Sequence, residues 1–324
     1  MGLWRIDADT LAQSRFVISP LAEATACLMA LKKGVAADPG ERAWLDAHLP
    51  AYRERLAGDP VTALVIEAAV RPRYLADFFT PTPLGQGEPS FQEELARIRD
   101  TPPGDARGHL ETALNGPIPA RLHRADLAVR AADLLDWVWT ESVLPYWERR
   151  RRILEADTVA RTRRLSRSGW AEALDDIRPG MRWLGEGRLQ VNVHDYPARR
   201  VHGARLMFVP VTRRHGWVSW EEPDRYAVVY PCSGTLAGAV RKPVPEALGR
   251  LIGPGRASVL VLLETPLSTT QLVALTGQGL GSVGRHLKVL LDAGLVRRRR
   301  SGRSVLYFRT DAGDGVIGAV DNPE

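Results

Sequence analysis

The densest group of charged side chains in the sequence lies near its C-terminus. Residues 241–310 contain twelve lysines and arginines and only three acidic residues, whereas residues 1–240 contain 32 basic and 31 acidic residues. Arg297 to Arg300 are consecutive, and Arg303 follows after a Ser-Gly pair. Guanidinium groups pair well with phosphates, and a basic excess confined to one segment is typical of nucleic-acid binding.

The position of this charge is more informative than its total. Forty of the 44 basic residues are arginines, a bias that we attribute to a GC-rich genome. The sequence pI of about 9.6 is therefore weak evidence by itself. The elements that would hold the C-terminal arginines in place decide what they can do.

Hydrophobic periodicity predicts three helices ahead of the arginines. Apolar residues at helical spacing flank Gly253-Pro254-Gly255. Ser268 is a suitable N-cap for a second helix over Thr269–Leu275, which Gly277 ends. A third helix over Leu280–Asp292 has one apolar face, and Gly294 supplies its left-handed C-cap.

A β-hairpin is predicted after these helices, with strands over Leu295–Arg300 and Val305–Thr310. Three helices and a basic hairpin are the pattern of a winged helix-turn-helix, whose third helix enters the major groove of DNA. Alternate residues of a strand share a face, so two of the four consecutive arginines should reach DNA. We expect these to be Arg298 and Arg300, joined by Arg303.

Four blocks of this segment resemble ArsR/SmtB-type transcriptional regulators. The blocks are LIGPGRASVLVLLE, LSTTQLVALTG, GSVGRHLKVLLDAGLV and RRRRSGRSVLYFRT, and together they cover roughly a fifth of the chain. The resemblance implies a homodimer that binds an imperfect inverted repeat of double-stranded DNA. It further implies repression of nearby genes and release from DNA when an effector binds.

The sequence departs from this family in two respects. The block TTQLVALTG has no cysteine, and the C-terminal DAGDGVIGAVDNPE lacks the Asp/His pair of the metal sensors, so metal sensing is not implied. The third helix carries Leu280, Gly281 and Gly284 where the family usually has polar side chains. Base reading then falls mainly on Ser282 and on Arg285, which can pair bidentately with guanine. The predicted DNA contacts are Thr269, Thr270, Gln271, Ser282, Arg285, His286, Lys288, Arg298, Arg300 and Arg303.

The remainder of the chain predicts an α+β fold, with helices to about residue 178 followed by a small antiparallel sheet. We expect a strand at Leu3–Ile6, a helix running from Asp9 or Thr10 to Leu31, and a loop over Thr101–Gly108. Residues 125–168 predict one long helix, or two broken near Pro145. The segments SPLAEAT, DFFTPTP, YWERRRRILEAD and MFVPV before VVYPCSG resemble a large N-terminal domain, of unassigned function, found ahead of this winged helix in bacterial regulators.

Three regions follow from this pattern. Residues 1–240 are an effector-sensing or dimerisation domain, residues 241–312 the winged helix, and residues 313–324 an acidic flexible tail. Residues 241–246 are the best candidate hinge. No signal peptide or membrane span is expected, which predicts a cytoplasmic protein.

All nine tryptophans lie in residues 1–240. Ordinary core packing is the default explanation, and the sharper one is an aromatic-lined cavity for an apolar small-molecule effector. The candidate effector-binding residues are Trp137, Tyr146, Trp147, Trp183, Trp217 and Tyr230. A second basic concentration, Arg149–Arg152 followed by Arg161, Arg163, Arg164 and Arg167, lies on the predicted long helix. Its four consecutive arginines point nearly all round the axis, which favours a solvated, salt-bridged face over an accessory DNA contact.

Other chemistries have little support in the sequence. His194, Asp195, His202 and His215 match no standard metal spacing, and Cys27 and Cys232 predict small core residues. No nucleophile motif or phosphate loop is present, so we expect no enzyme and no cofactor. Two alternatives to a repressor remain: a winged helix that binds a partner protein, and an enzyme with an appended DNA-binding domain.

Overall fold

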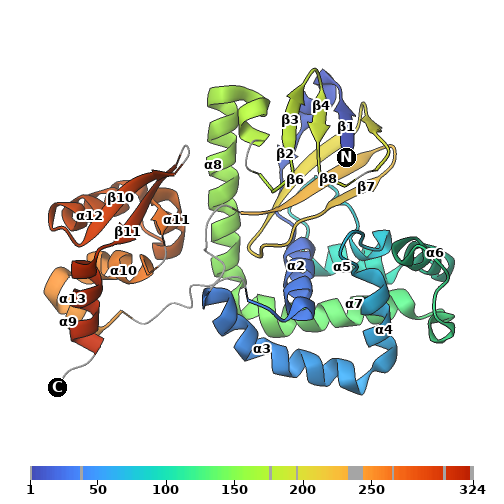
Figure 1. The fold of residues 1–324 in the computed structure, drawn as a ribbon, viewed down its shortest axis with the longest axis horizontal. Coiled ribbons are helices and arrows are strands. Elements are labelled where there is room, and N and C mark those ends of the chain that lie inside the picture. Colours follow the sequence, from blue (N-terminus) through green and yellow to red (C-terminus); the bar gives the residue numbers. More distant parts are fainter. Residues whose placement is uncertain are drawn as a thin grey trace. The chain divides into compact units, whose positions relative to one another are not determined.

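Most helices of the N-terminal region lie at one end, below its strands as drawn in Figure 1, whereas its last and longest helix rises beside the strands. The computed structural model describes residues 2–36, 39–174, 177–194, 196–232, 244–264, 266–301 and 304–321. The helices are α1 (Ala8–Gln13), α2 (Pro20–Lys33), α3 (Pro39–Gly58), α4 (Pro60–Ala69), η1 (Asp77–Phe79), α5 (Phe91–Arg99), α6 (Pro103–Leu114), η2 (Ala120–Leu122), α7 (Leu127–Val138), η3 (Trp139–Val143), η4 (Leu144–Tyr146) and α8 (Trp147–Leu174).

Local capping explains where these helices differ from the sequence prediction. The predicted helix from Asp9 to Leu31 is wrong: it is two helices separated by the short strand β2 (Arg15–Phe16). The Asp7 carboxylate accepts the Thr10 N–H at 2.7 Å and caps α1, and Ser19 caps α2 ahead of a proline at its first position. The predicted loop over residues 101–108 is largely the first turns of α6. The predicted break near Pro145 is confirmed by η3 and η4.

Eight strands of the N-terminal region form two four-stranded sheets. One has the order β3 (Arg182–Gly185), β4 (Arg188–Gln190), β1 (Leu3–Ile6), β5 (Arg199–Val201), and the other the order β2, β6 (Arg205–Val211), β8 (Arg225–Pro231), β7 (Val218–Glu221). Antiparallel pairing, as expected, joins β3 to β4, β4 to β1 and β7 to β8. The pairs β1–β5, β2–β6 and β6–β8 are parallel. The β7–β8 hairpin places its second strand beside β6, which sets the parallel direction.

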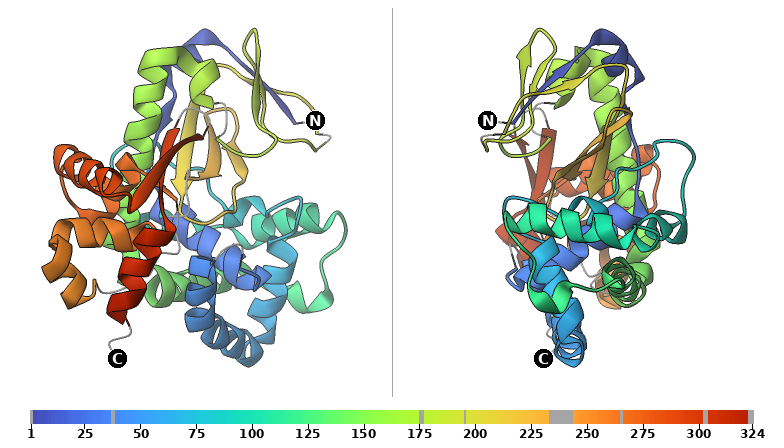
Figure 2. Two further views of the ribbon diagram at one scale, coloured as in Figure 1. Left: turned by 60° about the vertical axis from the view of Figure 1, so that its left-hand side comes forward. Right: turned by 90° about the vertical axis from the view of Figure 1, so that its right-hand side faces the viewer.

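The sheet that contains β6 and β8 is buried on both faces. Leu206 and Phe208 face a core that also holds Trp4, whereas Met207 and Val209 face a second core that holds residues of α2. Alternate residues of a strand point to opposite faces, so a strand covered on both sides becomes apolar throughout. This explains the continuous apolar runs in β6 and β8, and the two views of Figure 2 show both strands inside the N-terminal region.

The C-terminal region forms the predicted winged helix. Its elements are α9 (Glu246–Ile252), α10 (Pro254–Leu262), β9 (Leu267–Ser268), α11 (Thr269–Thr276), α12 (Leu280–Asp292), β10 (Val296–Ser301) and β11 (Ser304–Arg309), followed by α13 (Asp311–Asp321). The strand order of its sheet is β10-β11-β9. The expected α+β fold with a C-terminal winged helix is confirmed.

The prediction of a flexible acidic tail is wrong for residues 313–321, which belong to α13. Val316 and Ile317 pack against the buried Leu248, Ala257 and Val261. These two apolar residues gain more from burial than the surrounding acidic residues gain from remaining in a mobile, solvated tail.

Contacts group the chain into two units. One comprises residues 1–37, 45–148 and 157–232, and the other residues 38–44, 149–156 and 233–324. The predicted boundary at residue 240 and the first half of the predicted hinge, residues 241–243, lie outside the described residues. Along the part of the chain that the structure describes, no helix combines the length and apolar character needed to cross a bilayer.

Candidate nucleic-acid interface

Helix α11 is fixed at both ends by its own sequence. The Ser268 hydroxyl accepts the Gln271 N–H at 3.3 Å, and the Gln271 side-chain oxygen accepts the Ser268 N–H at 2.6 Å. This capping box satisfies two donors of the first turn, and Gly277 ends the helix with φ of 69°. Gln271 is buried and serves the cap, whereas Thr269 and Thr270 remain partly exposed. Among these three predicted contacts, the structure therefore leaves the two threonines available.

Helix α12 has one buried face and one outward face. Val283, Leu287 and Leu290 are buried, at the spacing of one helical stripe. The exposed Gly281, Gly284, Arg285 and Lys288 follow a spacing of three, one and three residues on the other side.

The outward face of α12 is flat in its first two turns. A Cβ atom added at Gly281 or Gly284 would meet no atom within 4 Å. The side chains of Arg285 and Lys288 project beyond this flat part of the helix. The polar groups on this face are thus two cations and exposed backbone.

Two other predicted contacts on α12, Ser282 and His286, have partners inside the domain. The Ser282 hydroxyl lies 3.1 Å from Gln278 Oε1 and 3.3 Å from His286 Nε2. The His286 ring packs over Gly255 of α10, where an added Cβ would lie 2.5 Å from Nε2. Burial, and then the positive charges of Arg256 and Arg285, lower the pKa of His286. His286 is thus a packing residue. Gly255 makes room for its ring, a role that the sequence pattern did not reveal.

The wing presents arginines on both of its faces. In the β10–β11 register Arg298 lies opposite Tyr307 and Arg300 opposite Val305, so Arg298 and Arg300 share a face. Arg297 and Arg299 lie on the other face, and the Arg297 guanidinium sits 5.8 Å from the ring centre of Phe308. All four arginines are exposed. Arg303 lies outside the described residues.

The cations of this surface have few acidic neighbours. Arg285, Lys288 and Arg298 form no ion pair with any residue in the ranges described for the winged helix. In contrast, Arg309 is paired with Asp314 at 3.0 Å. Unpaired guanidinium groups that stay in water keep their full charge for a polyanionic ligand.

The second basic run, on α8, is used within the protein. Arg150 is buried with its guanidinium 5.7 Å from the ring centre of Trp44, and Arg151 pairs with Glu155 at 2.9 Å. Arg161, further along α8, is buried beside Asp157 and stacks on Tyr230. The expected ion pairs are present, but Arg150 and Arg161 are buried and not solvated as predicted.

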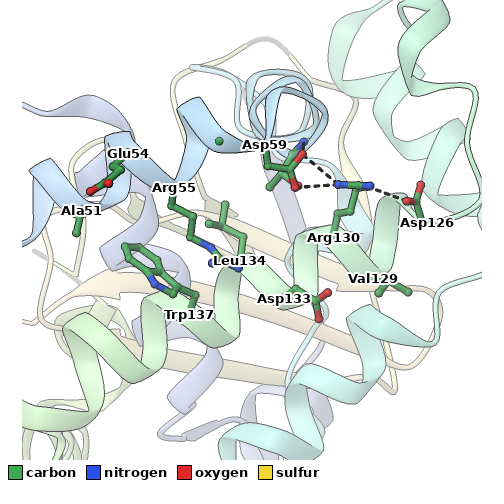
Figure 3. Close-up of a pocket in the computed structure, with 12 residues that line it drawn as sticks. Ala51, Glu54, Arg55, Asp59, Asp126, Val129, Arg130, Asp133, Leu134 and Trp137 are labelled. Carbon is green, nitrogen blue, oxygen red and sulfur yellow. Dashed lines mark hydrogen bonds and ion pairs between the residues drawn. The ribbon is translucent and has the colours of Figure 1, made fainter.

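The six candidate effector-binding aromatic residues do not line one cavity. Trp217 and Tyr230 are buried on the β6–β8 sheet, in two different cores. Trp147 packs against Trp139 at 5.1 Å, and Tyr146 against His48 at 5.8 Å. Trp183 lies on β3, packed at the edge of one core. Trp137 alone of the six lines a cavity of about 670 Å³ between α3, α4 and α7, shown in Figure 3.

Half of the residues that line this cavity are charged, so its chemistry does not suit the apolar effector predicted from the sequence. Among the described residues, no group of three or more His, Cys, Asp and Glu side chains could hold a metal ion. Asp195, one of the residues weighed for a metal, lies outside them.

Comparison with protein-family models identifies one domain. Residues 254–298 match the family described as bacterial regulatory protein, arsR family. The matched segment runs from the start of α10 to the third residue of β10, and so contains α11, α12 and the start of the wing. The chain therefore carries an arsR-family helix-turn-helix domain, a DNA-binding domain of transcription regulators. Comparisons with curated proteins and with solved structures gave no match.

Proposed function

We propose that the protein is a cytoplasmic repressor that binds an imperfect inverted repeat of duplex DNA as a homodimer. The observation that carries this proposal is the outward face of α12, where Arg285 and Lys288 stand exposed and without acidic partners inside an arsR-family domain. A dimer places two such helices on successive major grooves, which matches the symmetry of an inverted repeat.

Each part of the surface has a distinct role in this proposal. Arg285 pairs with the O6 and N7 atoms of guanine, and Lys288 contacts a flanking phosphate. Gly281 and Gly284 let the helix backbone lie closer to the base edges than larger residues would allow. Arg298 and Arg300 contact phosphates or the minor groove from the wing.

The N-terminal region supplies the control. It is nearly electroneutral and far larger than dimerisation of a winged helix requires. We place a small-molecule site there, and a ligand that binds differently to the DNA-competent and DNA-incompetent states shifts the affinity for DNA.

A second candidate is a winged helix that docks on a partner protein. Leu280 and Val289 of α12 favour it, because they are apolar and 51% and 43% exposed. Base edges offer little for such side chains apart from the thymine methyl group. A protein partner would bury both residues.

The test is DNA binding by the full-length protein. Duplexes tiled across the region upstream of its own gene are compared with random duplex by fluorescence anisotropy, at several salt concentrations. We expect one duplex to bind at least about 1,000-fold more tightly than random DNA, with two chains per duplex. The logarithm of the affinity should fall linearly with the logarithm of the salt concentration. Equal affinity for all duplexes contradicts the repressor and leaves the protein-docking candidate.

A further inference from the structure

The cavity between α3, α4 and α7 is built from residues that the DNA-binding proposal does not use. Its wall comprises Ala51, Glu54, Arg55, Gly58, Asp59, Thr62, Asp126, Val129, Arg130, Asp133, Leu134 and Trp137. Figure 3 shows these side chains converging from the C-terminal half of α3 and from one face of α7. A volume of about 670 Å³ falls in the range of small-molecule sites in proteins.

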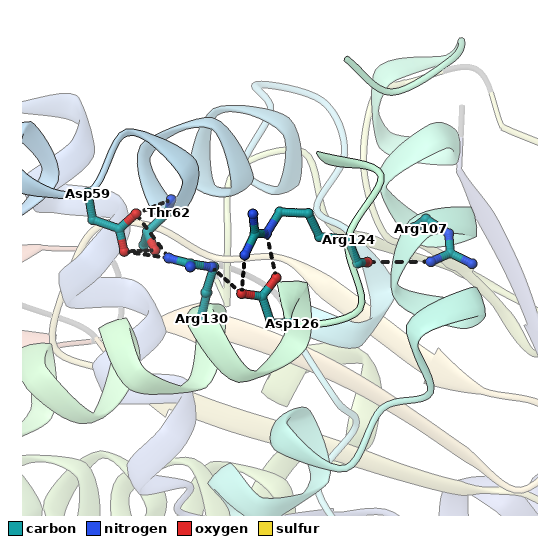
Figure 4. A network of polar contacts seen from close by, with 6 residues as sticks. All are labelled: Asp59, Thr62, Arg107, Arg124, Asp126 and Arg130. Carbon is teal, nitrogen blue, oxygen red and sulfur yellow. Dashed lines mark hydrogen bonds and ion pairs between the residues drawn. The ribbon is translucent and has the colours of Figure 1, made fainter. Parts of the chain in front are cut away.

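One end of the cavity is closed by a saturated ionic network, drawn in Figure 4. Arg130 donates to both oxygens of Asp59, at 3.0 and 2.8 Å, and to Asp126 at 2.8 Å. Thr62 donates to Asp59, and Arg124 donates twice to Asp126.

These hydrogen bonds lower the pKa of both carboxyl groups, through Thr62 at Asp59 and through Arg124 at Asp126. Both carboxyl groups are therefore ionised at neutral pH and already paired with cations of the chain. The open part of the cavity must supply any ligand contacts.

The other end of the cavity already holds a cation. The guanidinium of Arg55 lies 5.5 Å from the ring centre of Trp137, and Figure 3 shows it reaching across from α3 to α7. Arg55 and Glu54 form no ion pair with another residue in the ranges described. An exposed cation–π contact is weak, so a ligand can displace this side chain at small cost.

The balance of charge decides what the ligand should be. Four carboxylates and two guanidinium groups line the cavity, and Arg124 and Arg99 pair with two of these carboxylates from outside the lining. In the ranges described, Glu54 is the lining carboxylate that forms no ion pair, so its charge is available to a cation. Asp133 is already paired with Arg99 at 2.9 Å, but both side chains are exposed, and such pairs are weak. The face of Trp137, with Leu134 and Val129 beside it, accepts an aromatic or aliphatic body.

We propose that this cavity binds an organic cation, such as an aryl-alkyl amine, which replaces the Arg55 guanidinium on Trp137 and pairs with Glu54 and Asp133. Arg55 occupies the site in the free protein and acts as an internal competitor. The proposal names the ligand class for the small-molecule control suggested above, and to that extent it rests on the proposed function. The binding site itself does not depend on DNA.

The first experiment measures binding without DNA. Three probes that share a phenylethyl group and differ in charge, 2-phenylethylammonium, 2-phenylethanol and 3-phenylpropionate, are titrated into the full-length protein by calorimetry and by tryptophan fluorescence at neutral pH. We expect the ammonium probe to bind most tightly, and Trp137→Leu to abolish its fluorescence response. Tighter binding of the carboxylate, or no Trp137-dependent binding by any probe up to about 10 mM, overturns the proposal.

Replacing Arg55 distinguishes a cationic from an anionic ligand, because the two predict opposite changes in the affinity for the ammonium probe. Arg55→Ala should tighten binding of the ammonium probe about two- to fivefold, because the competitor is gone. Weaker binding in this variant would instead assign Arg55 to an anionic ligand and sink the proposal. Glu54→Gln should weaken binding of the ammonium probe about two- to fivefold. Arg53→Ala is the matched control, since Arg53 lies on α3 but does not line the cavity, and it should change nothing.

DNA affinity measured with and without the ammonium probe then separates the two proposals. A change that is lost in Trp137→Leu supports both the site and its role in control. Binding of the probe with unchanged DNA affinity keeps the cation site and removes the regulatory part of the proposed function. Specific DNA binding without binding of any probe overturns the cation site and leaves the proposed DNA-binding function standing.

Discussion

The N-terminal region (residues 2–232) and the winged helix (residues 244–309) treat charged side chains in opposite ways. Within the described chain, the buried charged side chains, Glu23, Glu41, Glu94, Arg150, Arg161 and Arg213, all belong to the N-terminal region. In the part of the winged helix that the structure describes, no charged residue is fully buried, and Arg285, Lys288 and Arg298 form no ion pair. A count of arginines therefore says little about function, whereas the partner of each arginine says a great deal. The predictions below test this contrast, beginning with the largest effect.

Removing a buried arginine of the N-terminal region should destabilise the fold strongly. Arg161→Ala removes the guanidinium that lies 3.8 Å from Asp157, a carboxylate that is 7% exposed and accepts the Tyr230 hydroxyl at 2.8 Å. We expect the free energy of unfolding to fall by about 3–5 kcal/mol in urea denaturation of the full chain. The control Arg151→Ala breaks an exposed pair and should cost at most about 1 kcal/mol. Similar costs for the two variants would remove the distinction.

The buried Glu94 should make stability depend on pH. Its carboxylate accepts hydrogen bonds from the Ser19 hydroxyl and the Leu21 N–H, both at 2.9 Å, yet burial raises its pKa to about 7. Because the pKa of Glu94 is higher in the folded than in the unfolded state, its protonated form stabilises the fold. This stabilisation is complete below about pH 4.5 and is lost as the pH rises through about 7.

Glu94→Gln should therefore stabilise the protein at alkaline pH, by at most about 3 kcal/mol, and flatten the pH profile of its melting temperature. The neighbouring Glu93 is exposed, and hydrogen bonds from Ser90 lower its pKa, so Glu93→Gln should give no such gain. An unchanged slope in Glu94→Gln contradicts the assignment.

In the winged helix, Arg285→Ala should affect DNA affinity and leave stability almost unchanged. We expect a loss of about 1–3 kcal/mol on the preferred duplex and relaxed preference at one base pair. Lys288→Ala is the comparison, because the loss of a phosphate contact weakens binding to all DNA sequences alike. Binding-site selection on a randomised duplex checks both variants. Identical profiles would show that neither side chain reads a base.

The two faces of the wing should differ in their salt dependence. Replacing Arg298 and Arg300 together by alanine should reduce the slope of log affinity against log salt by about 2. The opposite-face pair, Arg297 and Arg299, should change the slope less, since Arg297 is stacked on Phe308. Equal losses for the two pairs would mean that the wing meets DNA along its edge and not with one face.

The smallest effect concerns the glycines of α12. Gly281→Ala and Gly284→Ala meet no steric obstacle within the chain, so each should stabilise the helix by about 1 kcal/mol. If the backbone approaches DNA closely, the same variants should weaken DNA binding. Gly249→Ala in α9 has equal free space and should show the stability gain alone. A gain in stability with unaltered DNA affinity would show that the flat face is not used.

Much of the winged helix could be predicted because its signals are local. The Ser268 cap, the stop at Gly277 and the apolar stripe of α12 each act within one or two turns, and the structure reproduces all three. The roles of Gln271 and His286 could not be read from the recognition-helix pattern. One depends on a capping bond, and the other on packing between α10 and α12. The S-x-x-Q spacing of the capping box was the signal available for Gln271.

The sequence by itself determined the helices α11 and α12 and the β10–β11 hairpin, where the positive charge lies, and that an arsR-type winged helix carries it. Tertiary structure alone decided the parallel pairing of β6 with β8, the burial of Arg161 and the dispersal of the aromatic residues among several cores. The cavity that joins Arg55 to Trp137 also belongs to this second group. The physical reason is sequence separation: caps and periodicity act over a few residues, whereas burial and partner choice depend on segments that only the folded chain brings together.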